Sequence, residues 1–87
     1  LERSDALTAL LRRLHESRAR LLAIHEPLPE ALRGLVRAGP LDDAGWTLLV
    51  PSGAAAAKLR QLLPELEAAL QRQGWPALPI RIRVQAR

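Results

Sequence analysis

Residues 46–84, WTLLVPSGAAAAKLRQLLPELEAALQRQGWPALPIRIRV, decide the fold of this chain. The stretch begins with a short apolar run at 46–50, which indicates a strand with residues 46, 48 and 50 on one face. It closes with IRIRV at 80–84, where apolar residues alternate with arginines, so one strand face is apolar and the other basic. Between them, leucines recur at helical spacing over 53–73. This order predicts a strand–helix–strand crossover, which is right-handed in nearly all known cases.

Several residues mark the limits of the long helix. Ser52 is the candidate N-cap, because its hydroxyl can accept a hydrogen bond from a free amide of the first turn. Gly74 favours the end of the helix. Pro64 lies inside the helix and lacks the amide proton of a helical hydrogen bond. We therefore expect a kink at Pro64 or a split of the helix at Leu63.

The residues before the crossover predict a β-hairpin over 35–51. Its turn is Asp42–Asp43–Ala44–Gly45, where aspartate is favoured because its carboxylate accepts backbone hydrogen bonds. Pro40 cannot donate to a strand ladder, so the first strand should be irregular or lie at an edge. We expect Trp46 to lie in the core and Trp75 to cover the end of the long helix.

A leucine-rich helix is predicted over 1–26, with Ser4 as its candidate N-cap. Its leucines recur at helical spacing, at Leu7, Leu10, Leu11, Leu14, Leu21 and Leu22, while Arg12, Arg13, Glu16 and Arg20 fall mostly on other faces. A leucine zipper needs a longer heptad pattern than this, and Ser17 interrupts it. We expect the helix to dock on its own domain or on a partner. Pro29 and Gly34 then suit the start and the end of a second, short helix.

Together these elements predict one α+β domain over residues 1–87, in the order α-α-β-β-α-β. The crossover helix covers the apolar face of a three-stranded sheet, which gives a two-layer sandwich with helices packed on one face. The predicted elements are the helix 1–26, the short helix 27–34, the hairpin 35–51, the long helix 53–73 and the last strand 79–85. The other sheet face is expected to carry Arg81 and Arg83.

The composition limits the classes of protein to which the chain can belong. Its 87 residues carry a net charge of +4 and include no cysteine, which excludes disulfides and fits a reducing compartment such as the cytoplasm. The chain has neither an apolar run of about 20 residues nor a signal-peptide pattern, so no membrane association is expected. It also contains no methionine, so we expect it to be a fragment of a longer protein.

No group of residues predicts catalysis. A nucleophile needs a base beside it, and Ser4 and Ser52 are already expected to cap helices. His15 and His25 do not share a helical face and have no cysteine or paired carboxylates nearby, so neither is expected to bind a metal. The Gly-Lys-Ser or Gly-Lys-Thr of a phosphate loop is missing. We therefore expect a protein that is not an enzyme and that takes no cofactor and no small-molecule substrate.

The basic residues are the candidates for a binding site. Five are expected to contact a nucleic acid or a partner protein: Arg37, Lys58, Arg60, Arg81 and Arg83. A positive sheet face can hold a phosphate backbone without reading its sequence. Two other interpretations stay open. The arginines could protect an edge strand from aggregation, or the arginine-rich composition could have no specific role.

The chain from Pro40 onward resembles the DciA family of small bacterial proteins. The similarity rests on WTLLV at 46–50, on SGAAAAKLRQ at 52–61 with LPEL at 63–66, and on the closing IRIRVQ at 80–85. The run AAKLRQ followed by LPEL is the most specific of these. The leading helix, from Ala6 to Leu22, also matches the layout of the family, so the resemblance covers nearly the whole chain.

The resemblance implies a KH-like domain that binds the replicative DNA helicase and assists its loading on DNA, expected to be single-stranded, without ATPase activity. The chain departs from the family at Ala55, where many members have a tryptophan, which puts the packing under the start of the long helix in doubt. It also lacks the Gly-x-x-Gly loop by which KH domains clamp nucleotides. The alternatives are a protein-interaction or dimerisation module built on the first helix, and a KH-like RNA-binding protein.

Overall fold

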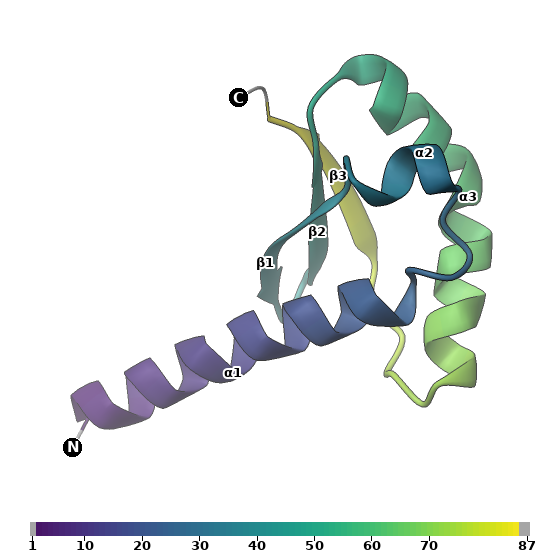
Figure 1. Cartoon of the computed structure of the whole chain (residues 1–87). Helices are drawn as coiled ribbons and strands as arrows, with labels where there is room; N and C mark the ends of the chain where they lie inside the picture. Colours follow the sequence, from purple (N-terminus) through teal and green to yellow (C-terminus); the bar gives the residue numbers. More distant parts are fainter. Residues whose placement is uncertain (1, 86–87) are drawn as a thin grey trace.

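The computed structural model describes residues 2–85, in which three helices and three strands follow the predicted order (Figure 1). The elements are α1 (Glu2–Ala23), α2 (Glu30–Arg33), β1 (Arg37–Asp42), β2 (Gly45–Val50), α3 (Gly53–Arg72) and β3 (Ile80–Val84). The α+β class and the element order expected from the sequence are therefore confirmed.

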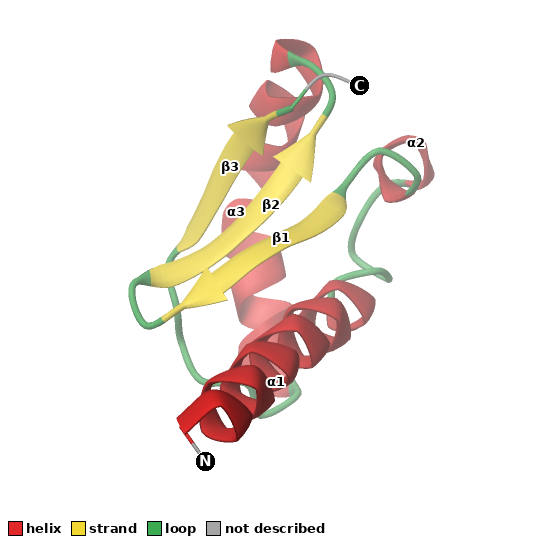
Figure 2. Ribbon diagram, turned by 90° about the vertical axis from the view of Figure 1, so that its left-hand side faces the viewer, coloured by secondary structure: helices red, strands yellow, loops and turns green. Residues whose placement is uncertain are grey.

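The three strands form one mixed sheet in the order β1-β2-β3. β1 and β2 are antiparallel, and β2 and β3 are parallel and joined by α3. Figure 2 shows α3 behind the sheet and α1 along the β1 side, while the front face of the strands is open. The expected two-layer arrangement is thus confirmed, with one sheet face against helix and the other uncovered.

The hydrophobic core lies between the sheet and α3. Trp46, Leu48 and Val50 alternate along β2 and are fully buried, as the sequence predicted. The other buried apolar residues are Ile24, Leu28, Leu32, Val36, Ala55, Ala56, Leu59, Leu66, Ala69 and Leu70. Burying a side chain the size of leucine or valine contributes roughly 1.5–3 kcal/mol before the loss of chain entropy is counted. Ala55 belongs to the same cluster as Trp46, so the core closes with a small residue at the start of α3.

The hairpin contains the irregularity expected at Pro40. The β1–β2 register shifts between Ala38 and Leu41, so Gly39 and Pro40 form a bulge. Gly39 is needed for close packing, because a β-carbon there would lie 2.8 Å from the carbonyl oxygen of Thr47. The bulge also decides which β1 side chains share a face with those of β2.

The start of α3 agrees with the sequence, and of the two outcomes expected at Pro64, a kink or a split, the split does not occur. The Ser52 hydroxyl accepts a hydrogen bond from the Ala55 amide at 3.2 Å and so caps the helix. α3 then continues without a break through Pro64. Pro64 and Arg60 are both exposed, so the Arg60 carbonyl that loses its helical partner can bond to water instead.

α1 meets the rest of the protein through its second half only. Ser17 and Arg20 are buried there, and so is Ile24 directly after the helix, whereas the sequence pattern placed Arg20 on another face from the docking side. The first half projects beyond the sheet (Figure 1). Five leucines of the expected stripe are exposed: Leu7, Leu10, Leu11, Leu14 and Leu22. Ser4 is not an N-cap, because α1 already begins at Glu2.

Candidate nucleic-acid interface

The strand register brings three of the predicted arginines to the open sheet face. Arg37 of β1 pairs with Leu49, and Arg83 of β3 pairs with Leu49 from the other side. Residues paired across neighbouring strands point to the same face, so the three side chains form one row. Arg81 pairs with Thr47 in the next row of that face. The three arginines and the two β2 residues between and beside them form a surface that we call the basic face: Arg37, Thr47, Leu49, Arg81 and Arg83.

The strand spacing sets the dimensions of the basic face. Neighbouring strands lie about 4.8 Å apart, so Arg37 and Arg83 start roughly 10 Å from each other on either side of Leu49. Both are exposed, and among the side chains that the structure describes neither makes a hydrogen bond or an ion pair. Two guanidinium groups on one open face can therefore bind an anion at no cost in internal contacts.

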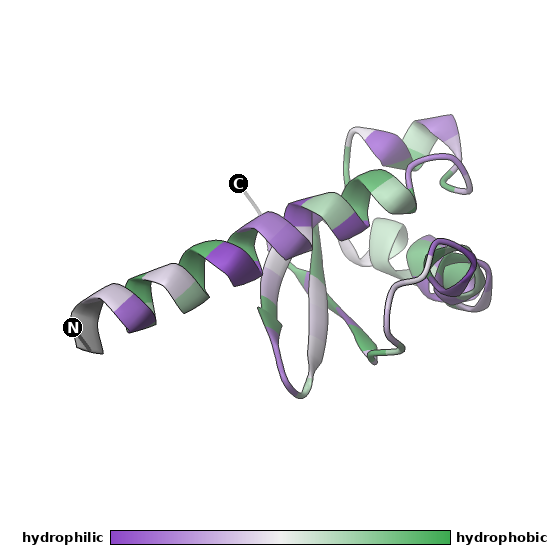
Figure 3. Cartoon of the chain, turned by 90° about the horizontal axis from the view of Figure 1, so that it is seen from below, coloured by the Kyte–Doolittle hydropathy of each residue, from purple (hydrophilic) through white to green (hydrophobic). Residues whose placement is uncertain are grey.

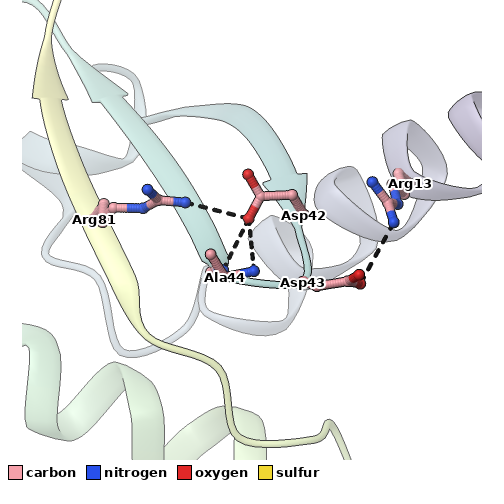
Figure 4. Close-up of polar contacts among 6 residues, drawn as sticks. Arg13, Asp42, Asp43, Ala44 and Arg81 are labelled. Atoms are coloured by element: carbon pink, nitrogen blue, oxygen red, sulfur yellow. Dashed lines mark hydrogen bonds and ion pairs between the residues drawn. The ribbon is translucent and has the colours of Figure 1, made fainter.

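Arg81 is held in a small network at the hairpin turn (Figure 4). Its guanidinium lies 3.3 Å from the Asp42 carboxylate, and both side chains are about half exposed. The same carboxylate oxygen accepts hydrogen bonds from the amides of Ala44 and Gly45, at 2.8 and 3.0 Å. The turn role expected for Asp42 is thus confirmed. Exposed ion pairs contribute about 0.2–1 kcal/mol, so Arg81 can exchange Asp42 for a phosphate.

Asp43, the second aspartate of the turn, has a different contact. Its carboxylate lies 3.4 Å from the Arg13 guanidinium of α1, and the Asp43 side chain is fully exposed (Figure 4). The hairpin turn therefore meets β3 on one side through Asp42 and α1 on the other through Asp43.

Lys58 and Arg60 do not join the basic face. Both are exposed on α3, which packs against the opposite face of the sheet (Figure 2). They are also two residues apart, so they lie on different sides of that helix. The five site residues predicted from the sequence therefore divide into three arginines that the sheet brings together and two residues behind the sheet.

Neither tryptophan lies on the basic face. Trp46 is fully buried, and its indole nitrogen donates a hydrogen bond to the Ser17 hydroxyl at 2.9 Å. The Trp75 ring is partly buried, with the Arg20 guanidinium 5.0 Å from its centroid. Bases bind single-strand modules largely by stacking on aromatic rings. On this face any nucleic acid must be held by charge.

The burial of two polar side chains of α1, Ser17 and Arg20, was not predicted from the sequence. The Arg20 guanidinium is 1% exposed, pairs with Glu16 at 3.0 Å and donates to the Pro76 carbonyl at 3.4 Å. Ser17 lies one turn earlier on the same side and bonds to the Gly39 carbonyl at 2.7 Å. The only signal in the sequence was Ser17 itself, a polar residue that interrupts the leucine spacing.

The part of the chain that the structure describes contains neither a group of metal ligands nor a membrane-spanning helix. Within residues 2–85, no three histidine, cysteine or acidic side chains form a group that could hold a metal ion. No helix among those residues is long and apolar enough to cross a membrane. No protein-family model matches the chain, and no curated protein matches it.

Proposed function

We propose that this chain is a non-enzymatic adaptor of the bacterial cytoplasm that binds the replicative DNA helicase and assists its loading on DNA. The helicase part rests on the resemblance of residues 40–85 to the DciA family. The DNA part rests on one observation, the basic face with Arg37, Arg81 and Arg83 on an uncovered sheet.

The chemistry of the basic face favours phosphate contacts without sequence recognition. Guanidinium groups bind phosphate oxygens in a two-pronged geometry. Leu49 lies between Arg37 and Arg83 and offers no hydrogen bond to base edges, and Thr47 beside Arg81 adds a single hydroxyl. A loader has to accept any sequence, so a weak and charge-driven contact suits this role. Single-stranded DNA is the expected ligand, since its backbone can follow a narrow row of charges.

The first prediction concerns the salt dependence of this contact. For single strands, the logarithm of affinity falls against the logarithm of salt concentration with a slope of about −0.7 per phosphate bound. Three arginines give an expected slope of about −2. In the double variant Arg37→Gln/Arg83→Gln the slope should become shallower, at about −0.7, because only one phosphate contact is left. Fluorescence anisotropy with a labelled oligonucleotide at several salt concentrations measures both slopes.

The matched control is Lys58→Gln/Arg60→Gln, which removes the same charge behind the sheet. It should keep the slope of the unchanged protein. Equal losses in the two double variants would mean that the net charge, not the basic face, attracts DNA. If the β3 arginines only protect an edge strand, Arg81→Gln/Arg83→Gln will aggregate more readily while the DNA affinity stays the same.

A second prediction concerns the helicase. The purified replicative helicase of the same organism should retain this chain in a pulldown. The charge reversal Arg81→Glu/Arg83→Glu should weaken that binding if the basic face is part of the interface, whereas Lys58→Glu/Arg60→Glu should not. Circular dichroism verifies that each variant is folded. Salt-sensitive binding to DNA without any retention by the helicase would contradict the adaptor role and leave a nucleic-acid-binding module.

A further inference from the structure

The projecting half of α1 carries an exposed apolar stripe formed by Leu7, Leu10, Leu11 and Leu14. Each of these residues is between 47% and 64% exposed. They are spaced three, one and three residues apart, so they occupy one side of the helix. Figure 3 shows this half of α1 extending away from the sheet, with hydrophobic bands along it.

Such a stripe is unfavourable in an isolated chain. The free half continues the docked half of a 22-residue helix and needs no nucleus of its own, but its apolar face is exposed to water. Four half-exposed leucines add roughly 400 Å² of apolar surface, the size of the largest patch on a typical monomer, and such patches are often functional. The free half of α1 is therefore a candidate interaction surface.

The stripe leads into a groove on the body of the protein. The groove has a volume of about 440 Å³ and runs between α1 and β1, where its apolar lining includes Leu14, Pro40, Leu41 and Leu49. Leu10 also borders it. Stripe and groove form one continuous apolar surface, with the free end of the helix at one end and the sheet at the other.

We propose that this surface is covered by a second copy of the chain, with the two α1 helices packed antiparallel. The spacing of the stripe is the same in both directions, with its centre between Leu10 and Leu11. A two-fold axis at that point sets Leu7 of one copy opposite Leu14 of the other and Leu10 opposite Leu11. Two-fold interfaces require this kind of self-complementary pattern.

The antiparallel pairing also covers the groove. The free half of each helix lies along the docked half of the other, so Leu7 of one copy enters the groove beside Leu14 of its partner. Next to the stripe, Arg13 comes level with Thr8 and His15 with Ala6, while Arg18 comes level with Arg3 at each end of the overlap. The repulsion between these arginines is screened by salt, so the association should be stronger at higher ionic strength. The leucines of both copies bury roughly 800 Å², and the flanking residues raise this toward the 1,000 Å² or so of a weak specific interface.

Cysteine cross-linking tests the arrangement directly, because the natural chain has no cysteine. The variants Leu7→Cys and Leu14→Cys are prepared separately, mixed and oxidised. The mixture should form a disulfide dimer, while each variant alone should not. In the antiparallel pair, position 7 of one copy lies about 10 Å along the helix axis from position 7 of the other copy. A disulfide cannot join two residues whose Cα atoms are more than roughly 7 Å apart. Dimers from each variant alone, with none specific to the mixture, would overturn the antiparallel register.

Sedimentation velocity over a range of concentrations tests the association itself. The unchanged chain should become dimeric as its concentration rises, and Leu7→Glu/Leu11→Glu should weaken the association at least tenfold. Both positions are on the projecting half, so the fold should be unaffected. The matched control is Leu22→Glu, which is 76% exposed on the same helix but beyond the overlap, and should leave the association unchanged. A chain that stays monomeric at all concentrations would overturn the proposal and leave the stripe to a different protein.

Discussion

The Ser17 hydroxyl and the Trp46 indole join α1 to the sheet in the interior of the protein. The buried Ser17 hydroxyl donates to the Gly39 carbonyl and accepts from the Trp46 indole, so it satisfies two groups at once. No buried side-chain nitrogen or oxygen is left without a partner in the described part of the chain. An unsatisfied buried group costs about 1–3 kcal/mol, so this single serine has a large effect on where the helix docks.

We predict that Ser17→Ala lowers the free energy of unfolding by about 1–3 kcal/mol, because the Trp46 indole nitrogen then stays buried without an acceptor. Urea unfolding followed by tryptophan fluorescence measures the change. Ser4→Ala, an exposed serine on the same helix, is the control and should change the stability by less than about 0.5 kcal/mol. Equal effects of the two substitutions would show that the hydroxyl bridge does not hold α1 in place.

At the scale of elements, α3 is a long helix with a proline that its environment tolerates. Pro64 faces solvent in the second half of the helix, while Leu59, Leu66 and Leu70 on the other side are buried against the sheet. Their burial outweighs the cost of the missing hydrogen bond, which is about 3 kcal/mol inside a helix. This is why α3 does not split at Leu63.

Pro64→Ala should therefore stabilise the protein. The regained helical bond and propensity exceed the loss of about 0.4–1 kcal/mol from a more flexible unfolded chain. We expect a gain of about 1–2 kcal/mol and a Tm higher by roughly 5–10 °C, measured by calorimetry. Glu67→Ala, an exposed change in the same helix, should stay within about 0.5 kcal/mol. A less stable Pro64→Ala protein would contradict this account of the proline.

At the scale of the whole molecule, the two proposed surfaces are neighbours. Leu49 lies between Arg37 and Arg83 on the basic face and also lines the apolar groove next to α1. A second copy seated in the groove would therefore lie beside the arginine row without covering the β3 end of it. The dimer would then carry two basic faces.

Much of the architecture could be predicted because it follows from local periodicity. The alternation in IRIRV and in the strand before α3 predicted both strands, the buried Trp46 and the basic side of β3. The Ser52 cap was also predictable, because capping depends on residues within one helical turn. These features are local in the chain, so neighbouring residues alone decide them.

The composition of the candidate site depended on contacts between distant residues. Arg37 joins Arg83 only because the bulge at Gly39 and Pro40 sets the register, and a one-residue slip would turn it to the other face. Lys58 was excluded for the same kind of reason, since the side of the sheet on which α3 packs is a property of the whole fold. Sequence spacing does not contain this information.

The sequence by itself determined the order of elements, the apolar face of each strand and the absence of a recognisable catalytic motif. Only the tertiary structure decided which side of α1 is buried. Either the leucine stripe or the side with Ser17 and Arg20 could have packed against the rest of the domain. The polar side is the buried one, because Ser17 pairs with Trp46 and Arg20 pairs with Glu16. Periodicity shows that a helix has an apolar face, but the surface that covers this face can belong to another molecule.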